Sequence, residues 1–558
     1  MPARRAKALL AARIAKASGA QVSPGLFQTP PAPNPGELAF PCFGLSKQLK
    51  RPPSRIAQEI AAALAPEPPL AKAEAAGPYV NLTLDTAWVV REALGNPPVP
   101  AAPRDETVVI DYSSPNIAKH MAVYHLRSTM IGNSLCRILR ALGYRVVGVN
   151  HLGDWGTGFG KLVVATRKWW DASKTPTVTD LNDLYVRFGK EAKEHPSLEE
   201  EARKAFADLE RGDPEVRKLW QRFRDVSLAE FERVYARLGV HFDEVSGESV
   251  YEPDLEPTLA MLRQKGLVEQ SEGALVVRLP GKEKPCLLKK SDGATLYATR
   301  DIAAALSHFR RHGFARKLYV VDKGQSLHFD EFFEVLKLAG FDWASRLEHV
   351  PFGVLRFGGK KGRTREGGVI LLEEVLDEAV SRALEVIRKN SPELPGPERV
   401  AAQVGIGAVV FHDLKNRRTN DIDFEWDEVL AFDGETGPYV QYAHVRACGI
   451  LRKGEELEIA FDPTASLDPL TLDEERKLAW ELSRHSEALE KAGEQAEPSV
   501  VAGYLLDLAK AFHAYHYKVP VLKSETATAK ARLRLIDAVR KTLAAGLDVL
   551  GIAAPERM

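Results

Sequence analysis

The chain has 558 residues, of which 45% are hydrophobic and 27% charged, with a formal net charge of zero. This composition is typical of a soluble globular protein of about three or four domains. Four widely spaced cysteines without a CxxC pair argue against a zinc site or a disulfide framework, and they fit a reducing cytoplasm. No apolar run approaches the roughly 18 residues of a membrane span, and no secretory signal follows the basic N-terminus. The net charge of zero does not indicate a nucleic-acid partner. Such a partner would need local basic faces on the protein.

The first part of the chain predicts a small α/β domain over residues 1–103. Ala6 to Ala17 is alanine-rich and helical in pattern, and Ser54 to Leu64 places apolar residues on one helical face. Tyr79 to Leu84 alternates like a strand, and the proline-rich stretch Asn96 to Pro100 is typical of a linker.

A strand–turn–helix–strand unit follows. Val108 to Ile110 is a β-branched run, Asp111 to Asn116 is a polar turn, and a helical pattern begins at about Ala118. Tyr144 to Val149 predicts the next strand, and several glycines crowd the turn after it. In open parallel sheets, ligands bind at the carboxyl ends of strands beside helix N-termini. The turn is therefore a candidate site, although ordinary capped crossovers have similar turns.

The remainder of the central region, 104–425, predicts a Rossmann-like catalytic domain with a helical insertion near 166–290. The stretch from Thr166 to Arg237 is highly charged and helical, and Leu275 to Lys290 has the pattern of a hairpin. Alternating helices and strands then complete the sheet, at 298–308, 317–321, 328–338, 348–354 and 371–388.

Residues 426–558 predict an all-helical domain. One of its helices carries the basic residues Lys530, Arg532, Arg534, Arg540 and Lys541. Such a basic side is usually a solvated face, but a helical RNA-binding domain also needs one.

Three strings in the candidate site are long and unusual: Ser113 to Lys119, His125 to Thr129 and Asn150 to Thr157. Together they resemble the nucleotide-binding half of arginyl-tRNA synthetases, which are class I aminoacyl-tRNA synthetases. Tyr439 to His444 and Gly551 to Met558 resemble the anticodon-binding domain of that family. The N-terminal layout is similar to the family's extra domain, which contacts the tRNA elbow.

The resemblance implies ATP-dependent ligation of L-arginine to tRNA(Arg) through an arginyl-adenylate, by a cytoplasmic monomer with no membrane partner. Mg²⁺ is expected with ATP, and no metal site is assigned. The catalytic residues that it implies are Lys119, His125, Lys361 and Arg365. The ATP-binding residues that it implies are Lys119, Tyr124, His125, Gly153, Lys361 and Thr364. The arginine-binding residues that it implies are Asp111, Ser114, Asn116, His125, Tyr297, Asp301 and Gln325.

Elementary chemistry supports the arginine set. A guanidinium is planar and always charged, so it needs a carboxylate and acceptors in fixed geometry. Tyr297 and Asp301 stand at i and i+4 of a helical pattern, and Gln325 lies at a turn before the next helix. The simpler interpretation of Asp301 is a salt bridge with Arg300.

The two class I signatures are altered in this chain. The first normally has the form His-x-Gly-His, and here Ala122 and Tyr124 replace its first histidine and its glycine. His120, just upstream, is a conceivable substitute for that histidine. In the second, Gly362 and Arg363 stand where methionine and serine are usual, and a basic glycine-rich loop is by itself only a mobile surface loop. The alternatives are therefore a diverted paralogue that binds arginine or tRNA, and an unrelated nucleotidyl-transfer enzyme.

Overall fold

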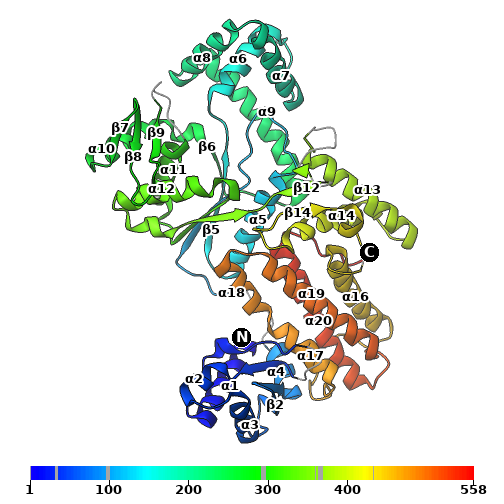
Figure 1. Ribbon diagram of the computed structural model, residues 1–558. Coiled ribbons are helices and arrows are strands. Elements are labelled where there is room, and N and C mark those ends of the chain that lie inside the picture. The colour runs from blue at the N-terminus through cyan, green and yellow to red at the C-terminus, as the bar shows by residue number, and fades with distance from the viewer. Residues whose placement is uncertain are drawn as a thin grey trace. The chain divides into compact units, whose positions relative to one another are not determined.

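The computed structural model describes residues 2–31, 36–95, 101–171, 173–290, 297–357, 360–361, 369–431 and 433–558. The chain packs as two compact units, whose elements are labelled in Figure 1. The catalytic unit comprises Ala102–Ser381 and Asn416–Asp427, and the flanking unit comprises Met1–Ala101, Arg382–Lys415 and Glu428–Met558. None of the described helices is both long and apolar enough to cross a membrane.

A parallel five-stranded sheet forms the centre of the catalytic unit, with the strand order β11-β10-β4-β5-β6. The strands are β4 (Thr107–Asp111), β5 (Arg145–Leu152), β6 (Glu244–Gly247), β10 (Arg316–Asp322) and β11 (Leu347–Phe352). Asp111 pairs with Tyr319 in β10 and with Val149 in β5, so the carboxyl end of β4 lies in the middle of the sheet. The Rossmann-like fold class is confirmed, and the predicted central strands are present.

Helices follow the strands of this sheet. They are α5 (His125–Ala141), α6 (Thr157–Trp169), α10 (Leu255–Gln264), α11 (Tyr297–His312), α12 (Ser326–Leu338) and α13 (Leu372–Asn390). The catalytic unit also has three described 3-10 helices, which are η2 (Glu248–Asp254), η3 (Lys323–Gln325) and η4 (Asp342–Arg346). Buried apolar residues of β4, β5, α10, α11 and α12 form one hydrophobic core.

The start of α5 differs from the prediction. The helical pattern indicated a start at about Ala118, but the helix begins at His125. Ala118 has a φ of 61°, which a right-handed helix excludes. Ala122 instead forms an antiparallel bridge to Leu371.

The insertion consists of α7 (Val178–Glu194), α8 (Ser197–Glu210) and α9 (Pro214–Leu238). With α6, these helices enclose their own apolar core, which includes Phe188 and Phe223. Figure 1 shows α6, α7 and α8 gathered at one end of the long helix α9.

The catalytic unit also contains two small sheets. One comprises β7 (Val268–Ser271), β8 (Ala274–Val277) and β9 (Cys286–Lys289), and includes the predicted hairpin. The other comprises β12 (Leu355–Phe357), β13 (Lys360–Lys361) and β14 (Ile422–Phe424).

The flanking unit joins the first part of the chain to the last. Its antiparallel sheet has β1 (Leu38–Pro41), β3 (Tyr79–Leu84) and β2 (Leu70–Ala76) in that order. Its N-terminal helices are α1 (Pro2–Ser18), η1 (Pro24–Leu26), α2 (Phe43–Leu49), α3 (Pro53–Ala63) and α4 (Thr86–Gly95). The later helices are α14 (Pro397–Leu414), α15 (Trp426–Val429), α16 (Gly437–Glu456), α17 (Asp473–Ser483), α18 (His485–Gln495), α19 (Ser499–Lys518) and α20 (Thr526–Val549). The expected helical C-terminal domain is confirmed.

A buried ion pair joins the two parts of the flanking unit. The Glu37 carboxylate accepts from Arg476 Nε of α17 at 2.8 Å, and its other oxygen accepts from the Leu84 backbone at 2.8 Å. A buried charge is tolerated only when it is paired in this way, so the pair holds the N-terminal sheet in one position against α17.

The predicted basic side of α20 is only partly correct. Arg532 is buried and donates to Glu475 at 2.9 Å, and Arg540 and Lys541 both pair with Asp537. Three of the five cations are therefore paired with two carboxylates of this domain, which leaves less positive charge for RNA than the sequence suggested.

Candidate active site

The turn after β4 has an unusual backbone. Ser113, Ser114 and Ala118 adopt φ values of 71°, 49° and 61°, a left-handed region that residues with a Cβ seldom enter. Hydrogen bonds fix it: the Ser113 backbone N–H donates to Ser128 Oγ at 2.9 Å, and the Ala118 N–H donates to Ser227 Oγ at 2.8 Å. Such conformations persist where the surroundings over-determine them, and they cluster at functional sites.

Gly153 allows this turn to approach the end of β5. A Cβ at Gly153 would lie 2.0 Å from Asn116 Oδ1, so any larger residue would displace the Asn116 side chain. Asn116 and Gly153 form a parallel bridge, and the Gly153 N–H donates to the Pro115 carbonyl at 3.1 Å. The predicted site residues Asn116 and Gly153 are therefore neighbours, and the glycine has a steric function.

A cavity of about 360 Å³ opens between the carboxyl ends of β4 and β10. Four of the predicted site residues, Ser114, Tyr124, His125 and Gln325, line it. The other lining residues are Ser113, Arg127, Ser128, Val320, Val321, Asp322, Phe352, Gly353, Val354 and Leu355. This is the position at which open parallel sheets bind ligands.

His125 is the first residue of α5 and is partly buried. Its Nδ1 lies 3.0 Å from the Ala122 backbone N–H, and burial lowers the pKa of the ring to about 4. The same Nδ1 lies 3.2 Å from the Ala122 carbonyl oxygen; when the neutral ring accepts from the N–H, its proton is on Nε2, which is then a donor toward the cavity. Tyr124 lies against the His125 ring with centroids 4.4 Å apart, and it is 45% exposed.

Carboxylates gather at the same end of the sheet. Asp111 is buried, which raises its pKa, and Ser114 Oγ donates to it at 3.2 Å. Burial also raises the pKa of Glu248 to about 7, with Asp301 among the neighbouring charges. Asp301 on α11 is 2.5 Å from His328 Nε2 on α12, the helix that begins directly after Gln325. Carboxylates that repel one another favour a cationic ligand, although Arg300 lowers the pKa of Glu248 and Lys317 lowers that of Asp111 by more than Asp301 raises them.

Sequence reasoning missed several groups around this cluster. Glu248 follows β6, a strand too short and polar to be predicted. Lys317 is fully buried on β10, where burial lowers its pKa to about 8 against the opposing effect of Asp111 and Asp301. His328, three residues after the predicted Gln325, was not predicted to belong to the site. Buried ionisable groups of this kind have no local signature in a sequence.

A returning segment also reaches the cavity. Asp421 accepts from Lys323 Nζ at 2.7 Å and from Arg356 at 2.6 Å. The buried Arg127 donates to the carbonyls of Gly353 and Asn420, both at 2.8 Å. Residues near 420 therefore support the wall formed by Gly353 to Leu355, which the sequence did not predict.

The other predicted residues do not line the cavity, and this includes Asp111, Asn116, Gly153 and Asp301. Lys119 is exposed, with Nζ 5.9 Å from the centre of the Tyr185 ring. Tyr297 is 66% exposed at the start of α11. The backbone of Lys361 in β13 pairs with that of Arg356 in β12. Thr364 and Arg365, like the signature positions 362 and 363, lie outside the described residues.

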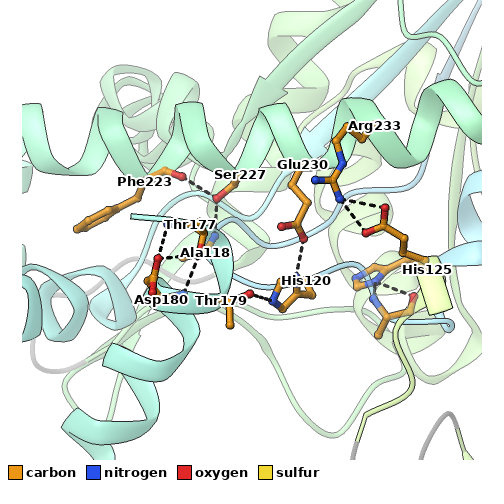
Figure 2. A network of polar contacts seen from close by, with 12 residues as sticks. Ala118, His120, His125, Thr177, Thr179, Asp180, Phe223, Ser227, Glu230 and Arg233 are labelled. Atoms are coloured by element: carbon orange, nitrogen blue, oxygen red, sulfur yellow. Dashed lines mark hydrogen bonds and ion pairs between the residues drawn. The ribbon is translucent and has the colours of Figure 1, made fainter. Parts of the chain in front are cut away.

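His120 does not line the cavity either. Figure 2 shows it directed at the insertion, where Nδ1 lies 2.6 Å from Glu230 of α9 and Nε2 lies 3.1 Å from Thr179 of α7. Both ring nitrogens are thereby engaged, so the ring anchors the backbone just before Ala122.

The flanking unit has an aromatic and basic cluster on α16 and α19. Arg446 lies over the Tyr442 ring at 4.7 Å and donates to its hydroxyl at 2.9 Å. The His513 ring stacks on Tyr442 with centroids 6.1 Å apart, and it also contacts Tyr439. Aromatic faces beside an arginine are suited to stacking with nucleic-acid bases.

Comparisons with known proteins agree with this geometry. Residues 90–426 match the family described as tRNA synthetases class I (R), catalytic domain. Residues 440–558 match the DALR anticodon binding domain, and residues 4–84 match the arginyl tRNA synthetase N terminal domain.

Individual relatives cover almost the whole chain. An arginine–tRNA ligase of Bacillus cereus is 47% identical over 550 residues, which is 96% of this chain and 95% of the relative. Another from an Exiguobacterium strain is 47% identical over 94% of each chain. The solved arginyl-tRNA synthetase of Thermus thermophilus superposes with a TM-score of 0.81 and 31% identity, covering 99% of this chain and 100% of that one. Full-length agreement in sequence and fold shows that the chain belongs to the arginyl-tRNA synthetase family of class I tRNA synthetases.

Proposed function

We propose that this protein joins L-arginine to tRNA(Arg) in two steps at the cavity between β4 and β10. The carboxylate of arginine attacks the α-phosphorus of ATP, which forms arginyl-adenylate and releases pyrophosphate. The terminal ribose hydroxyl of the tRNA then attacks the acyl carbon and releases AMP. The observation that supports this reaction best is the combination of a carboxylate cluster and a neutral histidine donor at one end of a parallel sheet.

The arginine side chain would be held by Asp301, Tyr297 and Gln325. The Asp301 carboxylate supplies the charge, and its contact with His328 fixes its orientation. Asp111, Ser114, Asn116 and His125 would hold the backbone groups of the amino acid at the turn after β4. Because a guanidinium stays charged at any physiological pH, a cluster of carboxylates selects it over neutral side chains of similar length.

ATP would occupy the same cavity beside His125. The Nε2–H of His125 can donate to the negative charge that develops on the phosphate oxygens. Lys119, Lys361 and Arg365 would add positive charge, and Thr364 would contact the phosphates. Gly153 leaves room for the turn that surrounds the nucleotide, and the exposed ring of Tyr124 provides a face on which the base can stack. Mg²⁺ would enter with the phosphates of ATP.

Transfer RNA would contact three predicted domains with boundaries at 1–103, 104–425 and 426–558. The helical domain offers the Tyr442 and Arg446 platform for bases. The protein would work as a monomer in the cytoplasm.

The proposed reaction can be tested by ATP–pyrophosphate exchange with arginine and tRNA both present. Arginine-dependent exchange supports the proposal. A folded protein without exchange would instead be a diverted paralogue, and exchange with another amino acid would refute arginine as the substrate.

The affinity for arginine should depend on pH through Glu248. Burial raises the pKa of this carboxyl to about 7, so it is ionised above pH 7 and protonated below. A cation binds the ionised form, so the arginine Kd should increase as the pH falls from 8 to 6, approaching about tenfold per pH unit. Calorimetric titration at several pH values measures this slope. Glu248→Gln should flatten it, whereas Glu334→Gln, at a surface ion pair on α12, should leave it unchanged. The same slope in both variants would contradict the assignment.

The tRNA platform can be tested separately. Tyr442→Ala removes the ring that Arg446 covers, and loss of one stacked base costs about 1–3 kcal/mol. The KM for tRNA should therefore rise about fivefold to a hundredfold, while the KM for arginine stays constant. Tyr185→Ala, at an exposed tyrosine of the insertion, is the control. If Tyr442→Ala leaves the KM for tRNA unchanged, the bases are read elsewhere.

A further inference from the structure

The insertion helix α9 contacts the turn after β4 at successive points. Ser227 Oγ accepts from the Ala118 N–H, and Glu230 pairs with His120 (Figure 2). Farther along the helix, the Tyr235 hydroxyl lies 2.8 Å from Ser113 Oγ. A single long helix therefore supports the turn from residue 113 to residue 120.

The same helix also holds the N-terminus of α13. Arg233 donates to Glu373 at 2.8 Å, and Arg237 pairs with Asp377 at 2.7 Å. The segment before α13 is in turn paired with the turn: the Val123 N–H donates to the Ile370 carbonyl at 3.0 Å, and the Leu372 N–H donates to the Met121 carbonyl at 2.9 Å. The backbone before His125 is thus held by α9 on one side and by the segment before α13 on the other. Helix α9 also contacts α13.

The pair of His120 and Glu230 is constrained from several directions. Only 24% of the His120 side chain and 17% of the Glu230 side chain are exposed, and their atoms are 2.6 Å apart. Thr179 occupies the other ring nitrogen at 3.1 Å, so the imidazole has a single orientation. Two residues later, the Ala122 backbone contacts His125 Nδ1 with its nitrogen at 3.0 Å and its carbonyl oxygen at 3.2 Å, so the position of this backbone decides which ring nitrogen carries the proton. Ala122 has no polar side chain with which to anchor this segment itself.

We infer that Glu230 and His120 are positioning residues, which fix the backbone at Ala122 and thereby orient the His125 ring toward the cavity. The insertion then contributes to the chemical step without touching either substrate. This inference depends on the proposed function only for its kinetic test. It also gives His120 a role: it anchors the altered signature from outside the cavity.

Two variants test the inference kinetically. Glu230→Gln keeps the size of the side chain but removes its charge, and His120→Ala removes the ring. Each should lower kcat for exchange about tenfold, which corresponds to about 1.4 kcal/mol of transition-state stabilisation, and leave the KM for arginine within about twofold. Because both variants break one pair, the double variant should be no slower than the slower single variant. Glu232→Gln, at an exposed site on the same helix, should have the unmodified kcat.

A spectroscopic measurement keeps this test independent of the proposed activity. In the full chain labelled with ¹⁵N-histidine, the ring signals of His125, assigned with His125→Asn, should report a proton on Nε2. Glu230→Gln should shift them, and Glu232→Gln should not. An unshifted His125 signal overturns the inference even if the unmodified protein is active. An unchanged kcat in Glu230→Gln also overturns the inference. A lower melting temperature with an unchanged kcat does the same, because it would show a purely structural role. Absence of exchange by the unmodified protein would refute the proposed function alone, and the NMR result would still decide the inference.

Discussion

Replacing Asp301 with asparagine should raise the KM for arginine by about tenfold to a hundredfold or more. The carboxylate would form a charge-assisted hydrogen bond with the guanidinium, worth about 1.5–3 kcal/mol, and a neutral amide loses most of it. The remaining carboxylates, Asp111 and Glu248, should compensate only in part, because burial raises the pKa of both and so disfavours their charged forms. The effect should appear in the KM for arginine and leave the KM for ATP nearly constant. Steady-state exchange kinetics at varied arginine concentration measures both constants.

Asp330→Asn provides the matched control, since Asp330 is an exposed carboxylate on α12. His328→Asn should give a smaller increase in KM than Asp301→Asn, because it removes only the group that orients the carboxylate. An arginine KM equal to that of the unmodified protein in Asp301→Asn would place the guanidinium elsewhere and would refute the arginine site proposed above.

Replacing His125 with asparagine should lower kcat for exchange by about a hundredfold to a thousandfold, the usual loss for a donor to developing charge. The KM for arginine should change far less, because the loss falls on the transition state. Since burial lowers the pKa of His125 to about 4, the ring is neutral throughout the range from pH 6 to 9. The profile of kcat against pH in that range should therefore show no step from His125.

The control for this substitution is His195→Asn, at an exposed histidine after α7. A kcat within twofold of the unmodified value in His125→Asn would exclude the imidazole from the chemical step. A step in the unmodified pH profile that disappears in His125→Asn would show that the ring titrates near neutrality and would contradict the burial argument.

The sequence predicted the central strand β4 well because it is a run of β-branched residues that is buried on both faces. Val108 to Ile110 shows this pattern, whereas β6, with the sequence Glu-Val-Ser-Gly, does not. Consequently Glu248, which follows β6, was missed as a member of the carboxylate cluster. The start of α5 was placed too early because its apolar periodicity says nothing about the left-handed backbone at Ala118.

Contacts between distant parts of the chain were the main source of error in the site. Arg532 looked like part of an RNA-binding face, but its partner Glu475 is 57 residues away in the chain. His120 looked like a substitute for a missing signature histidine, but Glu230, 110 residues away, holds it outside the cavity lining. Local patterns thus identified the residues near the turn, and only the tertiary structure shows which partner each polar group takes.

The ion pair between Glu37 and Arg476 has a consequence for how the protein is made. Glu37 leaves the ribosome more than four hundred residues ahead of Arg476, since 439 positions separate them. Until α17 is synthesised, the N-terminal sheet carries a carboxylate that must stay hydrated, and its docking surface is uncovered. The catalytic unit ends at Asp427, so all of it has been synthesised before α17 completes the flanking unit.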